Sequence, residues 1–122
     1  MADKRRILLV EDQQILCQLM SFELAEEGHE VTFAGDGVQA MALLEKVSFD
    51  IVVTDLYMPE MGGIELIKTM QNKSIDLPII VLSASRQGDV AVELNTLGIE
   101  HFIDKPITDD KMTLLLFYIS VL

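Results

Sequence analysis

Short apolar runs alternate with longer amphipathic segments along the whole 122-residue chain. This alternation is typical of α/β domains, in which each strand is followed by a helix that packs back on the sheet. The expected strands are residues 7–10, 30–34, 51–54, 78–82 and 99–103. The expected helices are residues 13–27, 38–47, the segment between Gly63 and Asn72, 88–97, and 108 to the end. These five units, with no linker between them, predict a doubly wound parallel sheet with helices on both faces.

The third expected strand ends on a carboxylate. Residues 51–54 are all β-branched, which favours a buried strand, and Asp55 follows them directly. Pro59 and the pair Gly62-Gly63 then force a loop. Ligands of an open parallel sheet bind at the carboxyl ends of the strands, near the point where strand order reverses. Asp55 is therefore expected at such a position.

Charge and composition limit the classes of function. Twenty acidic and nine basic residues give a net charge of -11, which repels a nucleic-acid backbone, so no direct nucleic-acid binding is expected. No apolar run reaches the roughly 18 residues that span a bilayer, and the first run is too short for a signal peptide. We expect one cytoplasmic domain over residues 1–122 without membrane contact. A single cysteine, Cys17, cannot form an internal disulfide.

Helix boundaries and faces are also predicted. Gly28 and Gly98 are expected to end the first and fourth helices, and Asp36 is expected to cap the second. The weak strand 30–34 is expected at a sheet edge. His29 and His101 have no partner at metal-ligand spacing, so surface or edge positions are expected for both. The first helix is expected to pack through one broad apolar face, made of Ile15, Leu16, Leu19, Phe22 and Leu24.

Polar groups end four of the five expected strands. Glu11-Asp12 follows the first strand, and Asp55, Ser83 and Lys105 follow the third, fourth and fifth. If the strands are parallel, these side chains meet at one edge of the sheet. Three neighbouring carboxylates repel one another and hold their charge only beside a cation. Because oxygen ligands suit hard divalent ions, we expect Mg²⁺ there, or Mn²⁺ in its place.

A carboxylate beside a metal ion and a lysine can attack phosphorus. We expect Asp55 to be the nucleophile that forms an aspartyl phosphate, with the metal ion and Lys105 offsetting charge on the phosphoryl oxygens. The hydroxyl of Ser83 is placed to donate a hydrogen bond to one of these oxygens. The ordinary alternatives are a helix cap for Asp12 and a solvated charge for Lys105.

The chain is similar to the receiver domain of bacterial two-component response regulators, such as the chemotaxis regulator. The resemblance covers nearly the full length and rests on the acidic pair Glu11-Asp12, the block Asp-Leu-Tyr-Met-Pro-Glu-Met-Gly-Gly from Asp55 to Gly63, the hydroxyl of Ser83, and Lys105-Pro106. Each motif alone is weak, but the set is specific. The resemblance implies a flavodoxin-like fold of five strands in the order 2-1-3-4-5 with five helices.

The resemblance also implies a phosphorylation-controlled signalling switch. In the family, the aspartate that matches Asp55 takes a phosphoryl group from the phosphohistidine of a sensor histidine kinase or a phosphotransfer protein. The domain assists this transfer and the later hydrolysis of the phosphate on its own aspartate, but it turns over no other substrate. By the same resemblance, the ligands of Mg²⁺ would be Glu11, Asp12, Asp55 and the backbone carbonyl of Tyr57. The Lys105-Pro106 bond would be cis.

A route from the phosphate to the surface is implied as well. Ser83 would move toward the phosphate and Phe102 would turn inward, which would change the surface of the fourth helix, fifth strand and fifth helix. A downstream protein target or an output domain would read this surface. Glu11 replaces the commoner aspartate and is expected to reach the metal through water. Phe102 replaces the frequent tyrosine, and a half-buried core position is its ordinary alternative.

The last helix carries two apolar stripes. Met112, Leu115, Leu116 and Ile119 can face the sheet. Leu114, Phe117, Tyr118 and Val121 recur at helical spacing on the other side, where a lone domain would show charges. Our hypothesis is that this second stripe docks a second copy of the chain in a homodimer, or covers a segment beyond Leu122. A frayed helix end without a partner is the alternative.

Three other functions stay open. A flavin-binding module would share the fold, but it needs a phosphate-binding loop where Glu11-Asp12-Gln13-Gln14 would repel a phosphate. A metal-dependent phosphatase of external substrates would need a cap domain or a substrate pocket. A degenerate receiver would act only in protein docking or dimerisation. If a phosphate forms, Tyr57 and Ser85 are expected near the path of the water that hydrolyses it.

Overall fold

The computed structural model describes residues 4–84 and 88–122, so Ser85 lies outside the described residues. Strands and helices alternate along the chain as predicted. The strands are β1 (Arg6–Val10), β2 (Glu30–Ala34), β3 (Ile51–Asp55), β4 (Ile79–Ser83) and β5 (His101–Asp104). The helices are α1 (Gln14–Glu26), α2 (Gly37–Leu44), α3 (Gly63–Asn72), α4 (Asp89–Thr96) and α5 (Asp109–Val121). No helix within the described ranges is long and apolar enough to cross a membrane.

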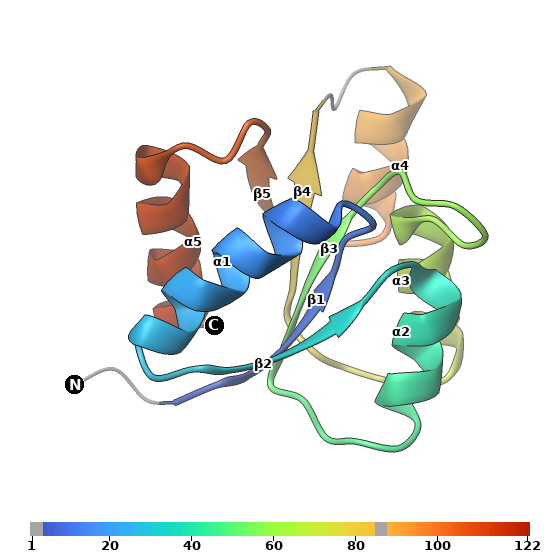
Figure 1. The fold of residues 1–122 in the computed structure, drawn as a ribbon. Helices are drawn as coiled ribbons and strands as arrows, with labels where there is room; N and C mark the ends of the chain where they lie inside the picture. The colour runs from blue at the N-terminus through green and yellow to red at the C-terminus, as the bar shows by residue number, and fades with distance from the viewer. Residues whose placement is uncertain (1–3, 85–87) are drawn as a thin grey trace.

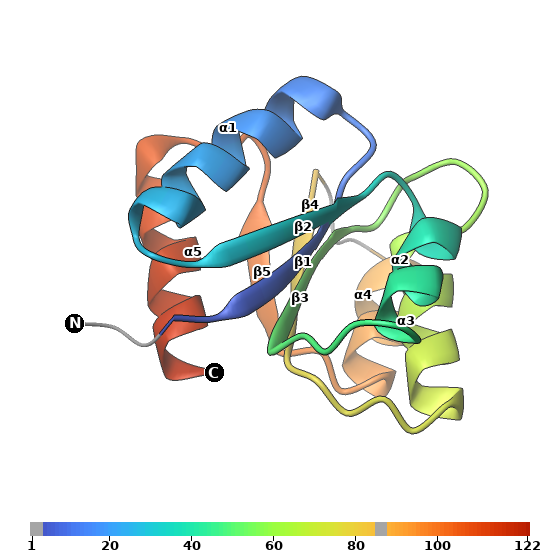
Figure 2. The same ribbon diagram turned by 60° about the horizontal axis from the view of Figure 1, so that its bottom comes forward.

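The five strands form one parallel sheet in the order β2-β1-β3-β4-β5, which confirms the predicted doubly wound, flavodoxin-like architecture. The weak strand β2 lies at an edge, as predicted. α1 and α5 cover one face of the sheet, and α2, α3 and α4 cover the other (Figures 1 and 2). Strand order reverses between β1 and β3, so a crevice for ligands is expected at their carboxyl ends.

Side chains of the central strands alternate between the two faces. Ile7, Leu9 and Val53 belong to the core under α1 and α5, whereas Leu8 and Val52 belong to the core under α2 and α3. A smaller cluster around Val81 and Leu94 lies under α4. Strands that are buried on both faces read as continuous apolar runs, and this explains the sequence pattern of β1, β3 and β4.

Gly28 and Gly98 follow the ends of α1 and α4, as predicted. After α4, the next strand begins later than predicted. Gly98 has a φ of 80°, its N–H donates to the carbonyl of Asn95, and the N–H of Ile99 donates to the carbonyl of Leu94. This pair of bonds is a Schellman motif, which uses the residue after the glycine to close the helix. β5 therefore begins at His101, and the predicted start at residue 99 is wrong.

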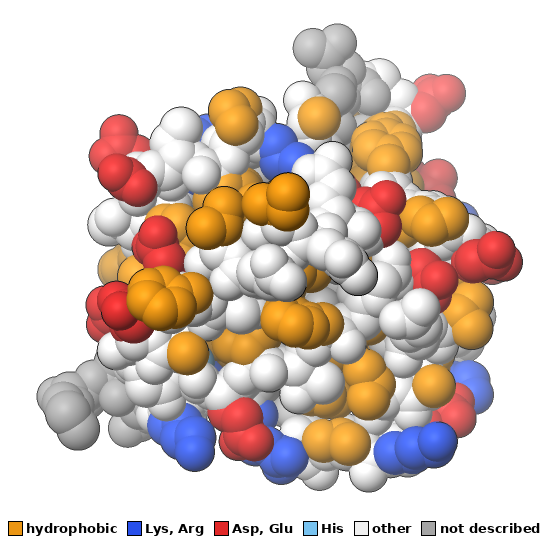
Figure 3. Space-filling model, in the orientation of Figure 1, with side chains coloured by type: hydrophobic (Ala, Val, Ile, Leu, Met, Phe, Trp, Pro, Cys, Tyr) orange, Lys and Arg blue, Asp and Glu red, His pale blue; other side chains and the backbone are white. Residues whose placement is uncertain are grey.

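The predicted buried face of α1 is wrong for three of its five residues. Three of these hydrophobic side chains are exposed to solvent, with exposed fractions of 74% for Ile15, 62% for Leu19 and 66% for Phe22. The side chains that α1 buries against the sheet are Cys17, Met20 and Leu24. Figure 3 shows hydrophobic side chains exposed in a line over α1, with acidic side chains near the end of the line. This exposed apolar line on α1 requires an explanation other than core packing.

The last helix fits its prediction more closely. Met112, Leu115 and Ile119 are buried against the sheet, and Leu116 is half-buried. In the second stripe, Phe117 and Val121 are each 58% exposed. Leu114 and Tyr118 are instead half-buried, and the ring of Tyr118 meets His101 edge to face at 4.9 Å. The second stripe is therefore narrower than predicted.

His29 precedes the edge strand β2, but its side chain is buried, contrary to a surface position. Its Nδ1 accepts the backbone N–H of Arg5 at 3.0 Å, and burial lowers the pKa of His29 below 6.5.

A histidine with a lowered folded-state pKa adds stability above the unfolded pKa, and this contribution is lost as pH falls through the folded pKa. We expect the urea midpoint to be lower at pH 5.5 than at pH 7.5, and this decrease to be smaller in His29→Asn than in the wild-type chain. An equal fall in both proteins would contradict this prediction.

Candidate functional site

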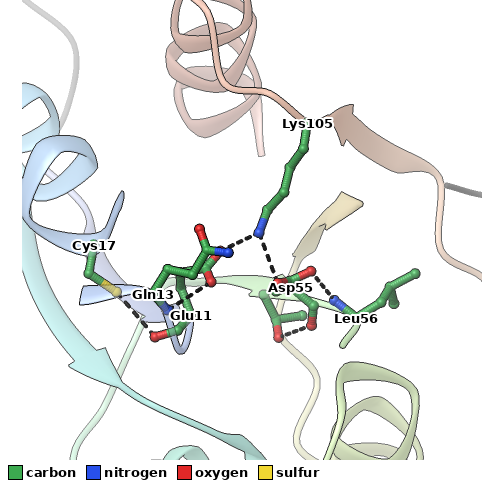
Figure 4. Close-up of polar contacts among 7 residues, drawn as sticks. Glu11, Gln13, Cys17, Asp55, Leu56 and Lys105 are labelled. Atoms are coloured by element: carbon green, nitrogen blue, oxygen red, sulfur yellow. Dashed lines mark hydrogen bonds and ion pairs between the residues drawn. The ribbon is translucent and has the colours of Figure 1, made fainter. Parts of the chain in front are cut away.

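Asp55 is the last residue of β3, and its carboxylate is held on both oxygens. Its Oδ1 accepts the backbone N–H of Leu56 at 2.7 Å, and its Oδ2 accepts Nζ of Lys105 at 2.9 Å (Figure 4). The residue is 6% exposed. The buried strand thus ends on a carboxylate whose two oxygens both accept hydrogen bonds.

The acidic pair follows β1, directly beside β3 in the sheet. Glu11 is buried, and its Oε1 accepts Nζ of Lys105 at 2.7 Å while its Oε2 accepts the backbone N–H of Gln13 at 3.1 Å. Asp12 is exposed. Carboxylate oxygens of Glu11, Asp12 and Asp55 lie within 4.8 Å of one another. The strand ends therefore bring together the three carboxylates that the sequence predicts.

Lys105 reaches this cluster from the loop after β5, the edge strand that lies two strands away from β3. It follows β5, and its backbone N–H donates to the carbonyl of Ser83 at 2.9 Å. Figure 4 shows its side chain directed between Glu11 and Asp55. Burial by itself would lower the pKa of Lys105, but the hydrogen bonds to Glu11 and Asp55 raise the pKa above its ordinary value. The lysine is therefore charged at neutral pH. The Lys105-Pro106 bond is cis, as predicted.

The charge balance of the cluster fits a divalent cation. Burial raises the pKa of Glu11 above its ordinary value, although the hydrogen bond from Lys105 opposes this shift. When the three carboxylates are ionised, the single ammonium of Lys105 leaves two negative charges in a largely buried place. Carboxylate oxygens at this spacing suit Mg²⁺ or Mn²⁺, which also keep water ligands. Glu11, Asp12 and Asp55 could hold such an ion.

The other predicted site residues lie around this cluster. Ser83 is fully buried at the end of β4, one residue beyond Leu82, which pairs with Asp55. Tyr57 follows β3 and exposes its side chain. Phe102 lies on β5 opposite Val81, half-buried in the cluster under α4 rather than beside the carboxylates. The stripe on α5 lies on the other face of the sheet from this α4 cluster (Figure 1).

Two contacts of the site were not predicted. The backbone N–H of Gln13 holds Glu11, and the thiol of Cys17 donates to the carbonyl of Glu11 at 3.2 Å. Burial raises the pKa of Cys17 to about 11, which keeps it a thiol at neutral pH. The Cys17 side chain is buried in the core under α1 and α5. Its spacing of six residues from Glu11 carries no motif that would reveal the contact in advance.

Comparison with known sequences gives one family. Residues 7–117 match the sequence model of the response regulator receiver domain. The response regulator SaeR of Staphylococcus aureus is 32% identical over 108 residues, which cover 88% of this chain and 47% of SaeR. The chain therefore spans about half the length of the curated relatives it matches.

Comparison with solved structures agrees. The non-phosphorylated HemR receiver domain from Leptospira biflexa is 31% identical with a TM-score of 0.86, covering 98% of this chain and 96% of that one. The chemotaxis response regulator CheY4 of Vibrio cholerae is 28% identical with a TM-score of 0.84, covering 96% and 99%. TrrA from Thermotoga maritima, solved in complex with Mg²⁺-BeF, is 26% identical with a TM-score of 0.78, covering 93% and 97%.

Proposed function

The chain belongs to the response regulator receiver domains of two-component systems, and we propose that Asp55 accepts a phosphoryl group and thereby switches a signalling surface. Receiver domains are signalling domains rather than conventional enzymes. The single observation that carries the proposal is the geometry of Asp55, a buried strand-end carboxylate within 4.8 Å of two further carboxylates and bonded to Lys105.

In the proposed reaction, one carboxylate oxygen of Asp55 forms a bond to phosphorus. The bond between phosphorus and the donor breaks, and its electron pair leaves with the donor, which is a phosphohistidine nitrogen or the acetate of acetyl phosphate. Leu56 orients the carboxylate through its backbone N–H. Lys105 moves from the free carboxylate to the phosphoryl oxygens, where its positive charge offsets the charge of the transition state.

Glu11, Asp12 and Asp55 are the proposed side-chain ligands of Mg²⁺, with the backbone carbonyl of Tyr57 as a fourth protein ligand. The ion, when bound, supplies positive charge to the phosphoryl oxygens. The structure of the relative TrrA with Mg²⁺-BeF supports this choice of metal. A water bridge between Glu11 and the ion remains a prediction, and so do the cytoplasmic location and the later hydrolysis of the phosphate by the domain itself.

The proposed switch runs from the phosphate to the surface of α4, β5 and α5. The buried hydroxyl of Ser83 ends the strand next to β3, so it can follow the phosphate. Phe102 lines a cavity of about 110 Å³ together with Leu94 and Ile99, and this cavity leaves room for the ring to turn. A downstream protein target or an output domain would read the changed surface.

The phosphoryl donor must border the same edge of the sheet. Ile15 follows Asp12 by three residues, and the exposed line of Ile15, Leu19 and Phe22 runs from there along α1. We place the contact of the histidine kinase or phosphotransfer protein on this line. With a kinase domain that phosphorylates the wild-type chain, Leu19→Glu is expected to slow transfer about tenfold, because a charge replaces a central apolar contact. Acetyl phosphate should phosphorylate both proteins equally, and equal transfer by the kinase would contradict this placement.

The direct test of the proposed function is intact mass after incubation with acetyl phosphate and Mg²⁺. The expected result is a gain of one phosphoryl group that disappears with EDTA and in Asp55→Asn, which keeps the size of the side chain but removes the nucleophile. A gain that persists in Asp55→Asn would overturn the assignment of Asp55. If neither acetyl phosphate nor a histidine kinase produces a gain, the degenerate docking or dimerisation module becomes the better explanation.

The exposed part of the α5 stripe supports the proposed homodimer. Phe117 and Val121 lie one turn apart and are both exposed. We expect the wild-type chain to associate with itself in sedimentation, most strongly after phosphorylation. The variant Phe117→Glu should remain a monomer, because a charge would be buried at the contact. A wild-type chain that is monomeric at all concentrations, phosphorylated or not, rules out the homodimer.

A further inference from the structure

The turn between β2 and α2, residues 34–37, contacts two separate parts of the proposed phosphoacceptor site. At one end, the carbonyl of Ala34 accepts the backbone N–H of Glu11 at 3.0 Å. At the other end, the backbone N–H of Gly37 donates to the carbonyl of Met61 at 2.8 Å. Met61 belongs to the loop that follows Asp55. Figures 1 and 2 show the start of α2 beside this loop.

Hydrogen bonds within the turn hold its shape. Oδ1 of Asp36 accepts the backbone N–H of Gln39 at 2.9 Å, which caps α2 as predicted. In return, Oε1 of Gln39 accepts the backbone N–H of Gly35 at 2.9 Å. Such reciprocal bonds satisfy the free N–H groups at a helix start and fix the direction in which the chain enters the helix. The turn is thus a defined spacer between its two contacts.

The contact with Met61 requires that residue 37 has no side chain. A Cβ atom on Gly37 would lie 2.5 Å from Cγ, 2.7 Å from Sδ and 2.8 Å from Cβ of Met61. Cγ and Sδ of Met61 could rotate away about the side-chain bonds, but its Cβ can move only with the backbone. Met61 is also packed against the core under α2 and α3. Gly37 has no positive φ, and alanine is the better helix former, so close approach explains the glycine.

We propose that the turn 34–37 is a brace that sets the separation between the acidic pair Glu11-Asp12 and the loop 57–62, and that Gly37 and Met61 are its positioning residues. This proposal rests on the proposed function. The loop carries the backbone carbonyl of Tyr57, so displacement of Met61 moves a proposed metal ligand relative to Glu11 and Asp12. Gly37 has no chemistry of its own and acts on Mg²⁺ affinity through the backbone.

The test measures Mg²⁺ affinity by calorimetric titration of the unphosphorylated chain. Gly37→Ala is expected to weaken Mg²⁺ binding about tenfold, the lower end of the effect of residues that orient metal ligands. Gly28→Ala is the matched control. Gly28 has a φ of 90° and nothing within 4 Å of an added Cβ, so the variant strains the backbone far from the site. It should lower the melting temperature and leave Mg²⁺ affinity unchanged.

A rescue variant separates positioning from general damage. Met61→Gly removes all three atoms that the new Cβ would meet, and it keeps the carbonyl that accepts the Gly37 N–H. The double variant Gly37→Ala, Met61→Gly should therefore bind Mg²⁺ more tightly than Gly37→Ala alone. If Gly37→Ala does not fold, Gln39→Met takes its place, because it removes the bond to Gly35 at an exposed position without a change of charge. It should also weaken Mg²⁺ binding.

The outcomes are distinct. Wild-type chain that binds no Mg²⁺ overturns the proposed function and the brace together. Wild-type affinity in Gly37→Ala, or in Gln39→Met where Gly37→Ala does not fold, overturns the brace alone. So does a double variant that binds no better than Gly37→Ala. Weakened binding in Gly37→Ala with recovery in the double variant, and no change in Gly28→Ala, supports the brace.

Discussion

Replacing Lys105 by methionine is expected to slow phosphorylation by acetyl phosphate about 100-fold or more. Methionine fills a similar space but carries no charge, so the phosphoryl oxygens lose one of the groups that offset their charge in the transition state. Loss of a single such group typically costs 10²- to 10³-fold in rate. The rate is followed by intact mass at saturating Mg²⁺, which keeps a change in metal affinity from being mistaken for a change in chemistry.

The same substitution should destabilise the metal-free protein. Lys105 is only 18% exposed and bonds to both Glu11 and Asp55, so its removal leaves two buried carboxylates facing each other. Removing one partner of a buried ion pair costs about 3 kcal/mol. Added Mg²⁺ should restore part of this loss, because it binds the folded chain and neutralises the carboxylates.

A matched control for Lys105 is available on the surface. Lys73 bonds to Glu45 at 2.6 Å, but both side chains are about half exposed. Lys73→Met should leave the urea midpoint nearly unchanged, because water screens an exposed pair. If Lys105→Met is phosphorylated as fast as the wild-type chain, Lys105 has no part in the chemistry. If its stability matches that of Lys73→Met, the buried-pair argument is wrong.

The carboxylates and the lysine could be predicted from sequence because parallel topology fixes where strand ends meet. Once β1, β3 and β5 are recognised as strands, Glu11, Asp55 and Lys105 must share one edge of the sheet. Local chemistry at a helix start could be predicted as well, since Asp36 caps α2 as expected. These features depend on chain direction and on neighbours within a few residues.

The face that α1 buries could not be predicted in the same way. The buried set is Cys17, Met20 and Leu24, and the exposed set is Ile15, Leu19 and Phe22. Both sets recur at helical spacing, and the exposed set is the more hydrophobic in composition. Periodicity therefore offers two stripes and does not decide which of them is buried. An exposed apolar stripe therefore gives the same periodic pattern in the sequence as a buried one.

The contacts of the turn 34–37 were hidden for a different reason. Gly37 and Met61 are 24 positions apart in the sequence, and their hydrogen bond joins two backbone groups. Backbone bonds of this kind leave no trace in residue chemistry except the absence of a side chain. The only sign in the sequence is a glycine near the expected start of a helix. The reason for this glycine becomes clear only from the atoms of Met61 that surround residue 37 in the structure.

Gly63 provides the sharpest case of such close approach. A Cβ atom on Gly63 would lie 2.3 Å from the carbonyl oxygen of Asp55 and 3.0 Å from Cα of Leu56. Both atoms belong to the backbone and cannot rotate away. The N–H of Gly63 also donates to the carbonyl of Leu56 at 2.9 Å, which fixes the start of α3 against the end of β3.

Gly63→Ala is therefore expected to lower the free energy of unfolding by about 3 kcal/mol, the upper part of the range for overpacking. Helix propensity alone predicts the opposite sign, because alanine is up to about 1 kcal/mol better than glycine inside a helix. Urea unfolding distinguishes the two. Gly98→Ala is the comparison: its φ of 80° strains alanine, but nothing lies within 4 Å of the added Cβ. A Gly63→Ala midpoint at or above that of Gly98→Ala would mean that β3 and α3 separate easily. Asp55 would then owe its position to Leu56 and Lys105 rather than to the packing of α3.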